Sequence, residues 1–140
     1  MYKRQVNRDF LRELYSDVKE SIDVVLKLVS KPYEELSDTE KFAIRYQIIV
    51  IAEALIAMAL HIVRRKYNYK PKTPIHAICF LKEALSIPEE TYDDVANIVK
   101  LRNLLVHRYW IIDDRKIYEN IKNNFEKILN FIERIIGNDG

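Results

Sequence analysis

The sequence has little of the two residues that build tight turns, since its 140 residues include only two glycines and four prolines. An all-β fold needs a turn after every short strand, so this scarcity argues against one and favours an all-α fold. The single cysteine, Cys79, excludes an internal disulfide framework and fits a reducing cytoplasm. The net charge is only +2, so overall charge does not mark the chain as a nucleic-acid-binding protein.

A secretion signal and a membrane span are not expected either. The first ten residues lack the apolar core of a signal peptide. Residues 48–63 are nearly all apolar, but Glu53 interrupts a run that is shorter than the roughly 20 residues of a membrane span. We therefore expect a cytoplasmic protein without membrane contact. We also expect a dimer, because a small bundle buries such a helix on most sides only if a partner covers its outer face.

Helical spacing of apolar residues runs through the whole chain. With 49% hydrophobic residues and a length typical of one domain, residues 1–140 are expected to form a single core. A capping-box pattern at residues 37–40, an acidic cap at 113–114 and Gly137 mark helix ends. The pattern predicts five helices, at about residues 7–29, 38–66, 75–85, 88–106 and 114–135. Four long helices and one short helix predict an all-α, up-and-down bundle.

Residues 101–110 carry an unusual set of polar side chains within an otherwise amphipathic helix: Arg102, Asn103, His107, Arg108 and Tyr109. These groups suit a phosphodiester, since an arginine holds a phosphate and an imidazole titrates near neutral pH. The amide and hydroxyl groups would orient a ribose. From the pattern alone, a structural role is the commoner alternative, in which the run caps carbonyl groups and pairs with the acidic residues at 113–114.

The spacing of this run resembles the R-x-x-x-x-H-x-Y signature of the HEPN superfamily, specifically its HepT branch, in Arg102, His107 and Tyr109. The likeness extends over most of the chain: the Glu53 helix ending in residues 61–63, the proline-containing loop, the short helix with residues 80–81, and residues 111–113 before the last helix. The resemblance implies a homodimeric, metal-independent ribonuclease toxin. It also implies a partner, a small MNT-type nucleotidyltransferase that silences the toxin by transferring AMP to Tyr109. Many HEPN-like domains are instead non-catalytic modules that bind nucleotide or RNA, and this alternative stays open.

The expected chemistry needs no metal and no cofactor, because RNA carries its own nucleophile in the 2′-hydroxyl group. His107 is the candidate proton-transfer group, and Arg102 would hold a non-bridging phosphate oxygen. Asn103 would orient the imidazole or the ribose, with Arg108 in a supporting role. The phenol of Tyr109 would help to hold RNA, and AMP attached there would add charge and volume where the substrate phosphate must lie.

The spacing also poses a geometric problem. Residues five apart on a continuous helix lie about 140° around its axis, so Arg102 and His107 would not share a face. Either the helix breaks near Val106 and His107 turns back toward Arg102, or the site is completed across a two-fold axis. We expect both, a break combined with a dimer cleft.

Two further features have an open interpretation. Glu53 lies within an apolar helix, where it would either tune Arg102 or form a purely structural ion pair. Residues 64–72 form the densest basic run, in which Arg64, Arg65 and Lys70 would track an RNA backbone while two tyrosines offer stacking faces. The same run would equally suit a basic helix end and a solvated loop.

Overall fold

The computed structural model describes residues 5–137, and this part of the chain consists of helices without a strand. The expected all-α class and the five helices are confirmed; the first four residues and the last three of the chain lie outside the described part. The helices are α1 (Arg8–Leu28), α2 (Asp38–Arg65), α3 (Pro74–Leu85), α4 (Glu89–His107) and α5 (Asp114–Ile136), and two short 3-10 turns are η1 (Tyr33–Glu35) and η2 (Tyr109–Ile111).

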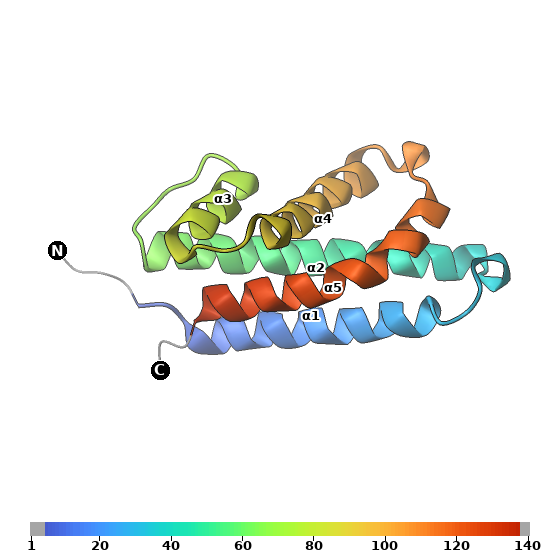
Figure 1. The fold of residues 1–140 in the computed structure, drawn as a ribbon, viewed down its shortest axis with the longest axis horizontal. Coiled ribbons are helices and arrows are strands. Elements are labelled where there is room, and N and C mark those ends of the chain that lie inside the picture. The colour runs from blue at the N-terminus through green and yellow to red at the C-terminus, as the bar shows by residue number, and fades with distance from the viewer. Residues whose placement is uncertain (1–4, 138–140) are drawn as a thin grey trace.

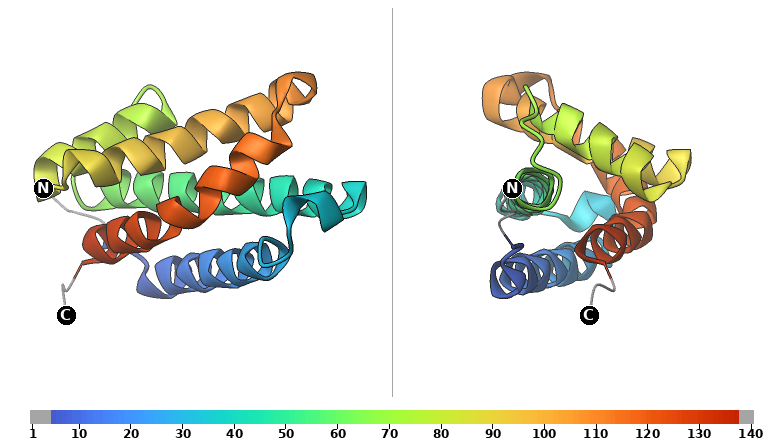
Figure 2. Two further views of the ribbon diagram at one scale, coloured as in Figure 1. Left: turned by 45° about the vertical axis from the view of Figure 1, so that its right-hand side comes forward. Right: turned by 90° about the vertical axis from the view of Figure 1, so that its left-hand side faces the viewer.

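The four long helices alternate in direction along one axis of the molecule (Figure 1). Helix α2 contacts each of the four other helices and so forms the centre of the bundle. The end-on view in Figure 2 places α1 and α5 on one side of α2, and α3 with α4 on the other. The short α3 packs against α2 and α4. This arrangement is the expected up-and-down bundle with one short extra helix.

Side-chain caps explain why the helices begin where they do. Ser37 accepts a hydrogen bond from the backbone N–H of Glu40 at 3.1 Å, and the Glu40 carboxylate accepts from the N–H of Ser37 at 3.0 Å. This reciprocal pair is the expected capping box, and it satisfies two amides that the helix itself leaves unpaired. Asp113 caps α5 with a single bond, accepting from the backbone N–H of Lys116 at 3.2 Å. Gly137 ends α5 with a φ of 77°, a conformation that glycine adopts without steric cost.

One face of α2 is left open by the other helices. Six residues share this face through their three- and four-residue spacing: Phe42, Tyr46, Ile49, Glu53, Ile56 and Leu60. Phe42 and Tyr46 are 59% and 63% exposed, whereas the opposite face of α2 is fully buried in the core. By length and composition α2 would suffice to cross a membrane, but half of its most apolar segment is buried inside the bundle. The central helix of a bundle can have the same length and apolar composition, and we interpret α2 as the core helix of this bundle.

A histidine joins the start of α1 to the end of α2. His61 accepts a hydrogen bond from the backbone N–H of Asn7 at 2.9 Å, and its ring lies 5.0 Å from that of Phe10. Burial, followed by the positive charge of Arg65, lowers the pKa of His61 below its usual value. The neutral form is required here, because a doubly protonated imidazole has no acceptor for the Asn7 amide.

This contact predicts a pH-dependent stability. The imidazole of the unfolded chain takes up its proton near pH 6.5, before the folded one does, so acidification favours the unfolded state. The free energy of unfolding should therefore fall as the pH drops from above about 6.5 through the lowered pKa of the folded state. Urea unfolding of His61→Gln should show a smaller dependence on pH over this range. The exposed His76→Gln is the matched control, and equal slopes for His61→Gln and the unchanged protein would contradict the prediction.

Candidate functional site

The end of α4 determines where the motif side chains lie. The helix continues through His107, and Arg108 then leaves the helical region with φ −142° and ψ 44°. Tyr109 begins the short turn η2, which leads through Ile112 into the capped start of α5. The motif therefore divides into a helical part that contains Arg102, Asn103 and His107 and a turn that carries the tyrosine.

Arg102 is held from two directions. Its Nε and Nη2 atoms both lie 2.5 Å from one carboxylate oxygen of Glu53 in α2. Its Nη1 atom donates to the side-chain oxygen of Asn103 at 2.9 Å. The Arg102 side chain is 25% exposed and that of Glu53 is 50% exposed, so the cluster lies at the surface. The structure thus brings Glu53, Arg102 and Asn103 together, on the open face of α2.

His107 is not part of this cluster within the protomer. It is exposed, and no contact with Arg102 is found among the residues described. The expected break near Val106 does not turn His107 back, because α4 ends one residue later and His107 is still helical. The expected return of His107 toward Arg102 was therefore wrong, because the two side chains remain about 140° apart around the helix axis. Completion of the site across a two-fold axis, the other solution that the spacing allowed, stays a prediction.

Tyr109 projects from the bundle together with its neighbours. Tyr109, Trp110 and Ile111 are 62%, 67% and 49% exposed, and the rings of Tyr109 and Trp110 meet edge to face at 5.4 Å. Three consecutive large apolar side chains on the surface are unusual for a segment with no partner. Because Tyr109 is more than half exposed, its phenol is accessible from outside the bundle.

Arg45 of α2 is a residue of this region that the sequence did not single out. Its Nε and Nη2 atoms bind the two carboxylate oxygens of Asp114 at 2.7 and 2.8 Å, and its Nη1 atom donates to the backbone carbonyl of Tyr109 at 3.3 Å. The hydrogen bonds to Asp114 raise the pKa of Arg45, against the effect of burial. The sequence gives only one sign of this contact: Asp114 follows the cap residue Asp113, and a helix cap alone does not require a second acidic residue.

These contacts bear on one part of the structural alternative for the motif, its pairing with Asp113 or Asp114. Asp113 caps α5 and Asp114 binds Arg45, so within residues 5–137 neither forms an ion pair with Arg102 or Arg108. Arg108 is exposed, and its backbone N–H donates to the carbonyl of Leu104 at the helix end. The motif arginines are thus not used to hold the start of the last helix.

The basic run lies far from the motif. Arg64 and Arg65 are in the last turn of α2, and Lys70 is exposed in the loop before α3. Figure 1 shows this loop near the opposite end of the bundle from η2, separated from it along α4. Arg65 donates to the backbone carbonyl of Gln5 at 3.5 Å. Within one protomer, the structure does not bring these cations to the Arg102 cluster.

The family model for ribonuclease HepT-like proteins matches residues 17–135. The chain belongs to the HepT-like ribonuclease family. The match covers both the Glu53 helix and the whole motif region. No curated protein matches the chain.

Solved structures with the same fold include toxins bound to their antitoxins. A toxin–antitoxin crystal structure with AMP-PNP has a chain 20% identical to this one, with a TM-score of 0.82 over 91% of this chain and 97% of that one. The tri-AMPylated HEPN toxin of Shewanella oneidensis in complex with its MNT antitoxin is also 20% identical, with a TM-score of 0.76 over 89% and 96%. The cytosolic protein YutE of Bacillus subtilis, of unknown function, is 18% identical with a TM-score of 0.78 over 96% and 90%. At these identities the likeness establishes the fold.

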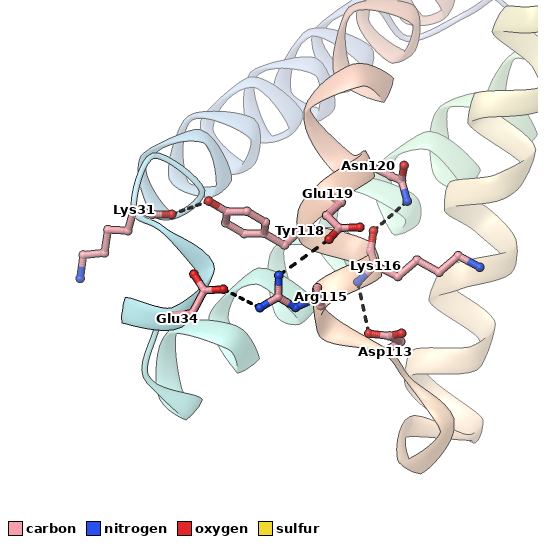
Figure 3. Close-up of polar contacts among 8 residues, drawn as sticks. All are labelled: Lys31, Glu34, Asp113, Arg115, Lys116, Tyr118, Glu119 and Asn120. Carbon is pink, nitrogen blue, oxygen red and sulfur yellow. Dashed lines mark hydrogen bonds and ion pairs between the residues drawn. The ribbon is translucent and has the colours of Figure 1, made fainter.

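The exposure of the Glu53–Arg102 pair predicts that it adds little to stability. An ion pair this accessible to solvent contributes less than about 1 kcal/mol, because water screens the charges and ordering the side chains costs entropy. Glu53→Ala should therefore change the free energy of unfolding of the single chain by less than about 1 kcal/mol, measured with urea at a protein concentration where the chain is monomeric. Glu34→Ala, which removes the exposed contact with Arg115 (Figure 3), is the matched control. A much larger loss in Glu53→Ala alone would assign the pair a structural role.

Proposed function

We propose that the chain is the toxin of a toxin–antitoxin pair, a metal-independent endoribonuclease that an MNT-type nucleotidyltransferase neutralises by attaching AMP to Tyr109. The observation that carries the proposal is the placement of Arg102 against Glu53 and Asn103, with His107 and Tyr109 at the adjoining end of α4. Membership of the family supports the ribonuclease activity. The fold shared with toxins bound to MNT antitoxins supports the pairing.

The active form is a homodimer whose sites lie across the two-fold axis. Glu53 and Arg102 lie on the open apolar face of α2, where Phe42 and Tyr46 are more than half exposed. A second copy packed on this face would bury these side chains and bring its own α4 end to the cluster. His107 of one protomer would then face Arg102 of the other, which removes the conflict between their positions on one helix.

The side chains present suit cleavage by the 2′-hydroxyl group of RNA. The 2′-oxygen bonds to the adjacent phosphorus, the bond from phosphorus to the 5′-oxygen breaks, and the products are a 2′,3′-cyclic phosphate and a 5′-hydroxyl end. His107 takes the 2′-hydroxyl proton or supplies one to the leaving oxygen. The contacts of Arg102 in the described structure engage at most three of its five N–H groups, so two remain for a phosphate oxygen that gains charge.

Neutralisation acts on the exposed phenol. The Tyr109 oxygen attacks the α-phosphorus of ATP, the bond to the β-phosphate oxygen breaks, pyrophosphate leaves, and the phenol proton passes to a base of the nucleotidyltransferase. The attached AMP introduces a negative charge two residues from His107. It would repel the RNA phosphate and occupy its space.

A two-fold site predicts that two inactive variants restore each other. Arg102→Ala and His107→Ala should each abolish cleavage of RNA, because each removes one side chain from both sites. Mixed dimers keep one complete site, so a re-equilibrated equal mixture should recover about one quarter of the original activity. Cleavage is followed in EDTA on a fluorescent RNA, and the product is checked for a 2′,3′-cyclic phosphate.

The same assay distinguishes the three ways in which the proposal can fail: in the two-fold site, in the metal-independent chemistry or in the catalytic activity itself. No recovery on mixing, with both variants folded and dimeric, would place the whole site in one protomer. Loss of the original activity in EDTA and its return with a divalent cation would refute the metal-independent chemistry. A protein that never cleaves RNA but binds it would favour the non-catalytic module.

Modification of Tyr109 is tested by mass spectrometry. After coexpression with the cognate nucleotidyltransferase, the peptide that contains Tyr109 should gain one or more AMP units, and the modified protein should lose its ribonuclease activity. Tyr109→Phe, which lacks the acceptor oxygen, should stay unmodified. Full neutralisation of a protein with unmodified Tyr109 would instead show inhibition by binding alone.

A further inference from the structure

We infer that Arg45 is a positioning residue for Tyr109, because its guanidinium anchors the backbone of η2 to α2 and α5 and so presents the tyrosine hydroxyl for modification. The inference rests on the proposed function for its consequence, since it concerns the acceptor of AMP. The anchor itself does not depend on that function, because its contacts are present in this structure.

The guanidinium of Arg45 joins three elements through three different nitrogen atoms. Two of them bind the carboxylate of Asp114, the first residue of α5, in the parallel two-bond geometry that arginine forms with carboxylates. The third donates to the carbonyl of Tyr109 in η2. The side chains of Arg45 and Asp114 are 17% and 20% exposed, so both are largely withdrawn from water. An arginine from α2 thus fixes the distance between η2 and the start of α5.

Few other contacts stabilise the turn η2 itself. Its internal backbone hydrogen bonds are local, from Ile111 to Arg108 at 3.1 Å and from Ile112 to Tyr109 at 3.4 Å. The side chains of Tyr109, Trp110 and Ile111 are largely exposed and so contribute little burial. Ile112, just after the turn, packs against the core, and the hydrogen bond from the charged Arg45 to the Tyr109 carbonyl adds a contact within the turn itself.

Anchoring the backbone while the ring stays exposed suits an acceptor residue. Group transfer requires the attacking oxygen to lie close to phosphorus and in line with the leaving group, and displacements of about 1 Å are costly. With its backbone fixed, the Tyr109 hydroxyl varies in position only through its side-chain torsions. With a loose backbone, the nucleotidyltransferase would first have to order the turn, and the entropy cost would slow the reaction.

The test compares two lysine substitutions of neighbouring arginines. Arg45→Lys keeps the charge but cannot bind both Asp114 oxygens and the Tyr109 carbonyl at once. Arg115→Lys is the matched control, because Arg115 follows Asp114 directly and pairs with Glu34 and Glu119 rather than with η2 (Figure 3). Both variants are compared with the original protein at a temperature where circular dichroism shows all three folded.

Two measurements are made on each protein. Hydrogen exchange of the purified chain should be faster at the amides of Ile111 and Ile112 in Arg45→Lys and unchanged in Arg115→Lys. In the reaction with the cognate nucleotidyltransferase and ATP, Arg45→Lys should lower kcat/KM for modification of Tyr109 on the order of 10-fold or more. The KM for ATP should not change, because ATP binds to the other protein.

Each result has a defined meaning. Unchanged exchange in Arg45→Lys would overturn the anchor. Faster exchange with an unchanged rate of modification would overturn its role in presenting the hydroxyl. A slower reaction of both lysine variants would point to general destabilisation of this corner and likewise count against the inference. If the original protein is never modified on Tyr109, the proposed neutralisation fails, while hydrogen exchange still decides whether Arg45 anchors η2.

Discussion

The carboxylate of Glu53 is the constraint on which the arrangement of the motif depends. It is the charged group on the face of α2 that the rest of the bundle leaves open, among side chains that are otherwise apolar or aromatic. Arg102 pairs with this carboxylate and, with its side chain 25% exposed, lies along the bundle surface rather than extending from it. The pair thereby fixes the position of the guanidinium, whose remaining freedom Asn103 limits. Under the proposed function, this is where a phosphate would bind.

Features that depend on neighbouring residues in the sequence were predicted well. The capping box at Ser37, the Asp113 cap and the stop at Gly137 involve residues at most four apart, and their residue types determine their geometry. Arg45 was missed because its partner, Asp114, lies 69 residues away, and an arginine on a helix carries no sign of which carboxylate it will bind. The two 3-10 turns were missed for a related reason, since short turns are set by the packing of the helices on either side.

Of the residues predicted for the site, the structure brings some together and leaves others apart, and their roles remain predictions. Glu53 was expected either to tune Arg102 or to form a purely structural ion pair; the structure pairs it with Arg102, which both interpretations allow. The position of His107 depended on whether α4 ends before or after it, a difference of one residue that capping signals do not resolve. The composition of the basic run around Lys70 indicated a positively charged segment but not its position in the fold. The up-and-down order of the helices places this segment at the end of the bundle opposite to η2.

The end of α4 reconciles two requirements that the proposed function places on His107 and Tyr109, which are two residues apart. A proton-transfer group must keep a fixed direction, which the helical backbone at His107 provides. An acceptor of a bulky nucleotide must be accessible and must tolerate added volume, which a tyrosine packed inside the bundle would not allow. The single non-helical residue Arg108 separates His107 from Tyr109. The hydrogen bond from Arg45 to the Tyr109 carbonyl then limits the motion of the turn. Under the proposed function, AMP on Tyr109 would keep RNA away through charge and volume alone, without any need to disturb the core of the bundle.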